Sequence, residues 1–267
     1  MTATPATPAT PVAAANAAGS AVPALVVEAF DVYRGLQVSV HVDRLWVDPG
    51  EIVALVGGPG SGKSTLLRGM GGLEPSRGLL QLAGGDLGPL PAHQRARAGL
   101  GLVAHHGRVS RQVTIAELLD LPWSLERAVD RRRWRSPAPA PGEPWSLYEL
   151  ADHLPGLDRV LHLTLADVGA WERQAVAIAL ALRSGPSVVM VDEPGAGLGD
   201  VSLERLRQSL RTIATRGVAV IMATRNASLA GELADRRLRL EQGRLLTAPT
   251  AGAVPGPAGS PRRDGVA

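Results

Sequence analysis

Short, wholly apolar runs recur in the chain and are separated by segments with a mixed pattern. Residues 52–56, 188–191 and 218–222 are such runs, and each has the length of a strand that is buried on both faces. Between the second and third runs, residues 203–213 carry apolar positions at the spacing of an amphipathic helix. This β-α-β order predicts an α/β protein built around a parallel sheet.

Two further segments have patterns of their own. Residues 24–47 contain β-type stretches, such as Val38–Val42. The chain from 118 onward is mostly helix-like, but an arginine run and a Pro/Ala loop interrupt it at 131–141. We interpret this part as a helical subdomain at about 118–168. The arginine run is taken as a solvated surface, with contact to acidic lipid or RNA as the alternative.

Both ends of the chain are low in complexity. Residues 1–24 form an Ala/Thr/Pro tract, and residues 247–267 are rich in Ala, Gly and Pro. Neither composition can bury a core, so we predict disordered tails around a folded domain at 25–246. The first tract lacks a basic start and a sustained apolar core, which is not the pattern of a secretory signal.

Composition narrows the classes of function. The chain has no cysteine, which excludes disulfides, thiolate metal sites and cysteine nucleophiles. Its net charge of +3 over 267 residues is too small to indicate a nucleic-acid partner, and none is expected. No apolar run approaches the ~20 residues that a membrane-spanning helix needs. We therefore expect a cytoplasmic protein with an aliphatic core.

The chain has a single lysine among its 28 basic residues, and this lysine lies in a glycine-rich loop. The loop follows the apolar run 52–56 and matches the pattern G-x-x-x-x-G-K-[ST]. Backbone N–H groups of such a loop cradle phosphates, and its lysine reaches the β- and γ-phosphates, where arginine is not an equivalent substitute. The predicted nucleotide-binding residues are Gly57, Gly58, Pro59, Gly60, Ser61, Gly62, Lys63, Ser64 and Thr65.

A second motif supplies acidic groups for the same site. The apolar run 188–191 ends in Asp192, Glu193 and Pro194. Ligands bind at the carboxyl ends of the strands in parallel sheets, so these residues should lie beside the phosphate loop. We predict that Asp192 and Ser64 hold Mg²⁺ and that Glu193 acts as general base on the attacking water.

These motifs, together with Glu172–Arg173–Gln174 and the apolar residues after it, resemble the ATP-binding cassette (ABC) family over about residues 26–246. The resemblance implies a P-loop NTPase (ABC ATPase) core with a mostly parallel sheet, an N-terminal antiparallel β subdomain and a helical subdomain. It implies ATP and Mg²⁺ as ligands and ATP hydrolysis as the activity. Tyr33 stands where the family has an aromatic residue that stacks on adenine, although an ordinary strand aromatic is the alternative.

The resemblance also implies partners and a location. An integral-membrane permease and a second cassette, in a homodimer or a heterodimer, would complete a transporter at the inner face of the cell membrane. Residues 104–121 correspond to the segment that receives a short permease helix. Its apolar residues would form either a docking groove or a core face: Val109, Val113, Ile115, Leu118 and Leu119.

The chain departs from the family pattern at residues that serve hydrolysis. His105 stands in place of a glutamine, Arg225 in place of the switch histidine, and the aspartate of a dimer-contact loop is displaced to Asp200. Residues 168–171 replace the signature Leu-Ser-Gly-Gly, and we expect Trp171 to obstruct approach to a neighbouring subunit's phosphate. His105, Glu193 and Arg225 are the candidate catalytic residues.

Two functions agree with this pattern. The first is an ATPase that powers a transporter, and residues 90–103 and 234–245 look most like cassettes of lipoprotein-release and macrolide-export type. The second is a regulatory or structural module that binds ATP and hydrolyses it slowly or not at all. A P-loop kinase or GTPase is a weaker reading, because a GTPase base-recognition motif needs a second lysine.

Overall fold

The computed structural model describes residues 22–104, 113–120 and 143–246. The tails predicted at 1–24 and 247–267 lie almost wholly outside this part of the chain, as does the arginine run. In chain order the elements are β1 (Leu25–Arg34), β2 (Gln37–Val47), β3 (Ile52–Val56), α1 (Lys63–Met70), β4 (Ser76–Leu82), β5 (Gly85–Asp86), α2 (Ala92–Arg97), β6 (Leu100–Val103), α3 (Ile115–Asp120), α4 (Leu147–His153), α5 (Leu157–Val160), α6 (Ala170–Leu182), β7 (Val188–Asp192), α7 (Asp200–Thr215), β8 (Ala219–Thr224), α8 (Ala227–Leu233), β9 (Arg236–Glu241) and β10 (Arg244–Leu246).

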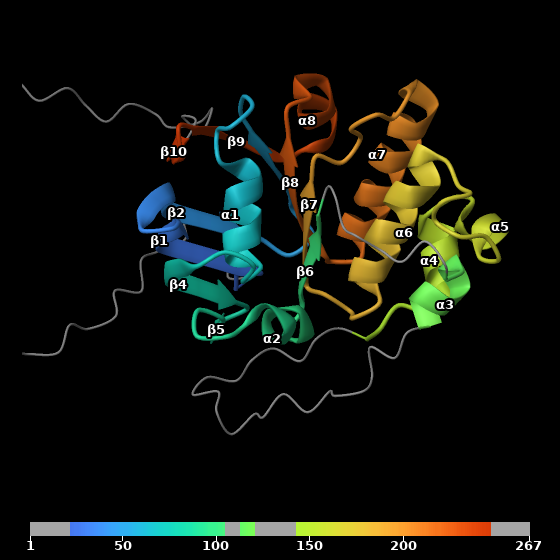
Figure 1. Ribbon diagram of the computed structural model, residues 1–267, viewed down its shortest axis with the longest axis horizontal. Coiled ribbons are helices and arrows are strands. Elements are labelled where there is room, and N and C mark those ends of the chain that lie inside the picture. Colours follow the sequence, from blue (N-terminus) through green and yellow to red (C-terminus); the bar gives the residue numbers. More distant parts are fainter. Residues whose placement is uncertain (1–21, 105–112, 121–142, 247–267) are drawn as a thin grey trace, which may run out of the picture.

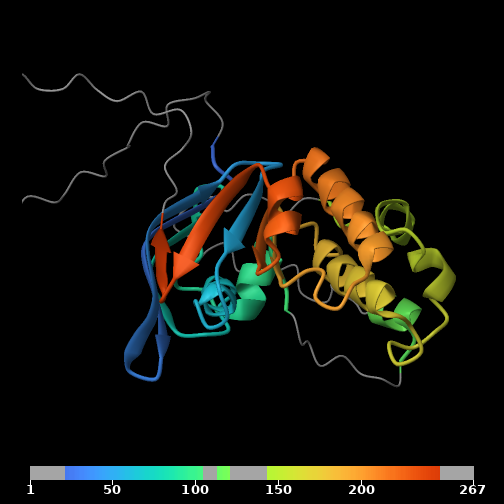
Figure 2. The ribbon, with the colours of Figure 1, turned by 90° about the horizontal axis from the view of Figure 1, so that it is seen from above.

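The strands form one curled sheet in the order β5-β4-β1-β2-β10-β9-β3-β8-β7-β6. Strands β9, β3, β8, β7 and β6 pair in parallel, whereas β5, β4, β1 and β2 pair in antiparallel fashion. Figure 2 shows the antiparallel part curving away from the parallel part. The predicted α/β fold, with its mostly parallel sheet and N-terminal antiparallel strands, is confirmed. The antiparallel strands continue the same sheet.

The central strands are apolar throughout because both faces of the sheet are covered. On β3, Ile52 and Ala54 belong to one buried cluster, and Val53 and Leu55 to the other. Strands β7 and β8 alternate in the same way between the two clusters. A strand whose successive side chains point to opposite faces can be apolar at every position only where each face is packed. The two covering layers fix β3 and β7, whose ends carry the predicted site.

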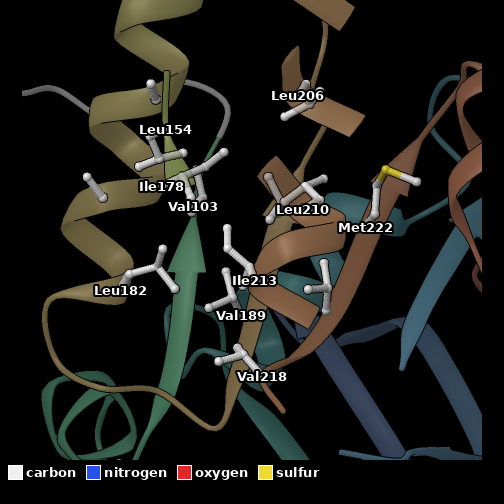
Figure 3. Close-up of a cluster of buried hydrophobic side chains, with 14 of the residues drawn as sticks. Val103, Leu154, Ile178, Leu182, Val189, Leu206, Leu210, Ile213, Val218 and Met222 are labelled. Carbon is white, nitrogen blue, oxygen red and sulfur yellow. The ribbon is translucent and has the colours of Figure 1, made fainter. Parts of the chain in front are cut away.

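Helices α6 and α7 cover one face, and α1 lies with the antiparallel strands on the other (Figure 1). Figure 3 shows the first cluster, in which side chains from both helices point toward β6, β7 and β8. Its labelled members are Val103, Leu154, Ile178, Leu182, Val189, Leu206, Leu210, Ile213, Val218 and Met222. None of the helices within the described part of the chain is long and apolar enough to span a membrane.

The described part of the predicted helical segment consists of α3, α4 and α5. Helix α4 begins with a capping box, in which Ser146 and Glu149 satisfy each other's backbone N–H groups. Ile115 and Leu119 are buried in the first cluster, and Leu118 is buried as well, so these three residues follow the second alternative, a core face. Their spacing places all three side chains on the buried face of α3. Docking of a permease helix at this segment stays a prediction. Val113 is half-buried, and Val109 lies outside the described residues.

Candidate functional site

The phosphate loop lies between the carboxyl end of β3 and the start of α1. Gly62 is the N-cap of α1 and has the left-handed conformation (φ 104°), which glycine adopts without strain. Gly58, Pro59 and Gly60 are exposed. Unpaired backbone N–H groups and the helix dipole make such a helix start favourable for an anion. This is the strand–loop–helix arrangement that the motif requires.

Lys63 is buried and its ammonium group faces back into the loop. Its Nζ donates hydrogen bonds to the carbonyl oxygens of Gly57 (2.7 Å) and Gly58 (3.0 Å) and to Ser61 Oγ (3.3 Å). Burial lowers the pKa of Lys63, while the nearby Glu193 carboxylate opposes this shift. Phosphate oxygens are stronger acceptors than neutral carbonyl oxygens, so the ammonium is placed to exchange these partners for a bound phosphate.

The predicted Mg²⁺ ligands come together across the site. Ser64 Oγ, in the first turn of α1, donates a hydrogen bond of 2.8 Å to Asp192 Oδ1 at the end of β7. A hydroxyl and a carboxylate are the hard oxygen ligands that Mg²⁺ uses together with substrate phosphates. Within the described ranges, no cluster of three or more His, Asp or Glu could hold a metal by itself. These two residues therefore fit a metal ion that arrives with a nucleotide.

Glu193 and Arg225 form an ion pair that the sequence pattern did not predict. Arg225 Nε lies 3.1 Å from Glu193 Oε1, and the backbone N–H of Arg225 donates to Oε2 at 3.2 Å. Glu193 itself has a positive φ of 47°, held by a hydrogen bond from its N–H to the carbonyl of Ala223. An open pocket borders the pair and is lined by Glu193, Pro194, Gly195, Ala196, Thr224, Arg225 and Asn226. The candidate base is thus oriented by Arg225, which directly follows β8.

The remaining candidate residues are Thr65, Tyr33 and His105, of which the structure describes the first two. Thr65 is half-buried in the first turn of α1, beside Ser64. Tyr33 is half-buried on β1, where its backbone N–H donates to Pro75 at 2.9 Å, and its stacking on adenine stays a prediction. His105 lies outside the described residues.

The signature-like segment 168–171 lies at the start of α6, but the predicted obstruction by Trp171 is wrong. Gly169 is the N-cap of the helix, and Gly169 and Ala170 are both exposed. The Trp171 side chain is only 3% exposed and packs in the first cluster. Its indole N–H donates to the carbonyl of Pro155 at 2.9 Å. The side chain therefore leaves the helix start open, because it points into the core.

Replacing Trp171 with glycine should destabilise the fold without relieving any obstruction. Loss of a buried tryptophan costs about 3–5 kcal/mol of unfolding free energy. The matched change Ala170→Gly, at the exposed neighbouring position, should cost only about 0.5–1 kcal/mol. Urea unfolding followed by circular dichroism measures both. Equal stability of the two variants would contradict the buried position of Trp171.

Comparisons with known proteins agree with this geometry. A family model described as ABC transporter matches residues 40–196. The lipoprotein-releasing system ATP-binding protein LolD of Pseudomonas syringae pv. tomato is 36% identical over 227 residues, which cover 83% of this chain and 91% of that protein. A putative ABC transporter ATP-binding protein of Streptomyces avermitilis is 33% identical over 237 residues, which cover 88% of this chain and 40% of that protein.

A solved structure shows the same fold. A nucleotide-free ATP-binding cassette from an ABC transporter has a TM-score of 0.69 and 16% identity, over 84% of this chain and 90% of that one. The family model covers more than half of this chain, and the likeness to LolD extends over most of both proteins. The chain therefore belongs to the ABC transporter family, as one of its ATP-binding cassettes.

Proposed function

We propose that this cassette binds and hydrolyses Mg-ATP and couples both steps to a separate integral-membrane permease. One observation carries the proposal: the buried Lys63 ammonium lies inside a complete phosphate loop, beside the hydrogen-bonded pair Ser64–Asp192. A loop of this kind binds the phosphates of a nucleoside triphosphate. The relative named LolD is an ATP-binding protein of a lipoprotein-releasing system, which favours a transport role of that type.

Each residue has a role in the proposed reaction. Lys63 and the N–H groups of the loop hold the β- and γ-phosphates, and Tyr33 stacks on adenine. Ser64 and Asp192 would hold Mg²⁺, which would neutralise charge on the phosphate oxygens. Glu193 accepts the proton of the water that attacks the γ-phosphate. His105 stands at the position that would link this site to the permease.

Arg225 has a restraining role in this mechanism. Its two hydrogen bonds to Glu193, one to each oxygen, hold the carboxylate in one orientation. A general base must present an oxygen within hydrogen-bond reach of the attacking water, so a fixed orientation toward Arg225 restricts proton transfer. The isolated cassette should therefore turn over slowly, and binding of a γ-phosphate would give Arg225 a competing anionic partner. The alternative of a purely regulatory module is less favoured, because Glu193 is present and the named relatives are transporter subunits.

We propose that two cassettes act together, as a homodimer or with a different cassette. The start of α6 at Gly169 and Ala170 is exposed, and Trp171 is turned inward. A helix start of this kind can approach the phosphates that a neighbouring cassette holds. The dimer with its permease would lie at the inner face of the cell membrane.

Isolation from membranes tests the coupling to a permease. We expect affinity-tagged cassette, solubilised with mild detergent, to carry an integral-membrane protein with it. The change Val113→Glu places a charge on the half-buried residue that precedes α3 and should weaken this association several-fold. The matched control is Leu73→Glu, because Leu73 is an exposed apolar residue just after α1.

Both variants must keep wild-type ATP binding and thermal stability for this comparison to be valid. Equal association of the two variants with the membrane protein would exclude the segment near Val113 as the docking site. Recovery of wild-type cassette without any membrane protein, with and without nucleotide, would contradict the transporter role itself.

A further inference from the structure

The turn between β9 and β10 contacts the phosphate loop from its outer side. The backbone N–H of Gly243 donates to the carbonyl oxygen of Ser61 at 3.0 Å. The carbonyl of Gly243 accepts from the backbone N–H of His41 on β2 at 2.7 Å. Through these two backbone hydrogen bonds, Gly243 connects β2 with the phosphate loop.

This contact fixes the direction of a phosphate-binding group. The carbonyl of Ser61 and the N–H of Gly62 belong to one planar trans peptide unit, so they point in opposite directions. Because Gly243 holds the carbonyl at the outer side, the Gly62 N–H is directed to the opposite, inner side of the loop. Successive N–H groups on that side form the concave anion site of a phosphate loop.

The turn is held tightly against β2. Gln242 and Gly243 both have positive φ values, 46° and 77°. A Cβ atom added to Gly243 would lie 2.2 Å from the carbonyl oxygen of Ser39. A side chain at this position would therefore push the turn away from β2 and break its hydrogen bond to Ser61.

The loop also contacts β9 directly. A Cβ atom added to Gly57 would lie 2.3 Å from the carbonyl oxygen of Leu240 on β9. One strand residue separates Leu240 from the turn. At Gly57 the phosphate loop therefore packs directly on the backbone of β9, and Gly62 packs on the side chains of Val40 and Leu240 beside the turn. A shift of the turn would be transmitted to the loop, because close-packed atoms cannot absorb it.

We propose that Gly243 is a positioning residue that sets the affinity for the phosphates of ATP and ADP without touching the nucleotide. This inference rests on the proposed function of the loop as an ATP site. Gly243 acts through the Ser61–Gly62 peptide, so its loss should weaken binding and leave the chemical step at saturating ATP unchanged.

The chain contains a matched control turn. The β4–β5 hairpin has the same two-residue form, with Ala83 at φ 42° and Gly84 at φ 86°. A Cβ atom added to Gly84 would meet nothing within 4 Å. Gly84→Ala therefore imposes a similar backbone strain on a similar turn, without a clash and away from the phosphate loop.

The experiment compares Gly243→Ala with Gly84→Ala by steady-state ATPase kinetics and by calorimetry with ADP. For Gly243→Ala we expect KM for ATP and Kd for ADP to rise by roughly five- to tenfold, as for loss of one backbone hydrogen bond, with kcat within about twofold of wild type. Gly84→Ala should leave all three constants unchanged. A fall in kcat at unchanged KM, or equal effects of both variants, would overturn the proposal.

A second variant removes the hydrogen bond alone, in case Gly243→Ala does not fold. Glycolic acid at position 243, introduced by nonsense suppression, replaces the amide N–H with an ester oxygen and adds no atom that could clash. The same rise in KM and Kd supports the positioning role, and unchanged constants overturn it. Wild-type protein that binds neither ATP nor ADP would instead contradict the proposed function, which separates the two failures.

Discussion

The variant Lys63→Ala should lose nearly all binding of Mg-ATP. Wild-type cassette is expected to bind in the micromolar-to-millimolar range, and loss of the ammonium should weaken this by roughly 100-fold, as for removal of a buried charge-assisted contact. The physical reason is that Lys63 is buried inside the loop, where its charge is poorly screened by water. Isothermal calorimetry with Mg-ATP measures the change.

Two further substitutions at basic residues sharpen this test. Lys63→Arg keeps the charge, but a planar guanidinium cannot reproduce the compact contact of one ammonium with the carbonyls of Gly57 and Gly58, so it should fail as well. Arg68→Ala removes an exposed cation from the same helix and should bind ATP normally. Equal affinity of wild type and Lys63→Ala would refute the site.

The variant Glu193→Gln should abolish whatever ATP hydrolysis the cassette has. We expect phosphate release by the purified chain alone to be slow, because Arg225 holds the Glu193 carboxylate in one orientation through a hydrogen bond to each oxygen. Glutamine has the same shape but cannot accept the proton from water, and loss of a general base lowers rates by about 10²- to 10⁴-fold. A phosphate-release assay at saturating Mg-ATP measures both proteins.

Binding provides the control for this second prediction. Glu193→Gln should keep its affinity for Mg-ATP within a few-fold, because Lys63, Ser64 and Asp192 are unchanged. Residual hydrolysis equal to that of wild type would remove Glu193 from the mechanism. Rapid turnover by the purified wild-type chain would show that Arg225 does not restrain it.

The central strands and the phosphate loop were predictable because their signals are local. A run such as 52–56 is apolar at every position only when both faces of its strand are packed, and the loop carries its own motif. The ends of α7 were harder to predict from the sequence. Its apolar positions indicate 203–213, whereas the helix extends over Asp200–Thr215. Gly199 caps its start, and Val201 in the first turn is exposed and lies outside the buried stripe.

Contacts between distant segments were not predictable from the pattern. Trp171 lies at the start of a helix, and its position in the sequence suggested an exposed side chain. Its indole N–H instead donates a hydrogen bond to the carbonyl of Pro155, which is 16 residues away in the sequence. Glu193 and Arg225 meet only because β7 and β8 are neighbours in the sheet. The inward face of α3 likewise depends on how that helix packs on α6. Such orientations are decided by tertiary packing.

Amine-reactive reagents would meet a single lysine side chain in this protein. The Nζ atom of Lys63 lies inside the phosphate loop, and burial lowers its pKa, which increases the fraction of uncharged, nucleophilic amine at a given pH. A bound phosphate would both cover this amine and favour its charged form. Acylation at Lys63 would therefore report how much of the loop is filled by nucleotide, with no competing lysine signal from the rest of the chain.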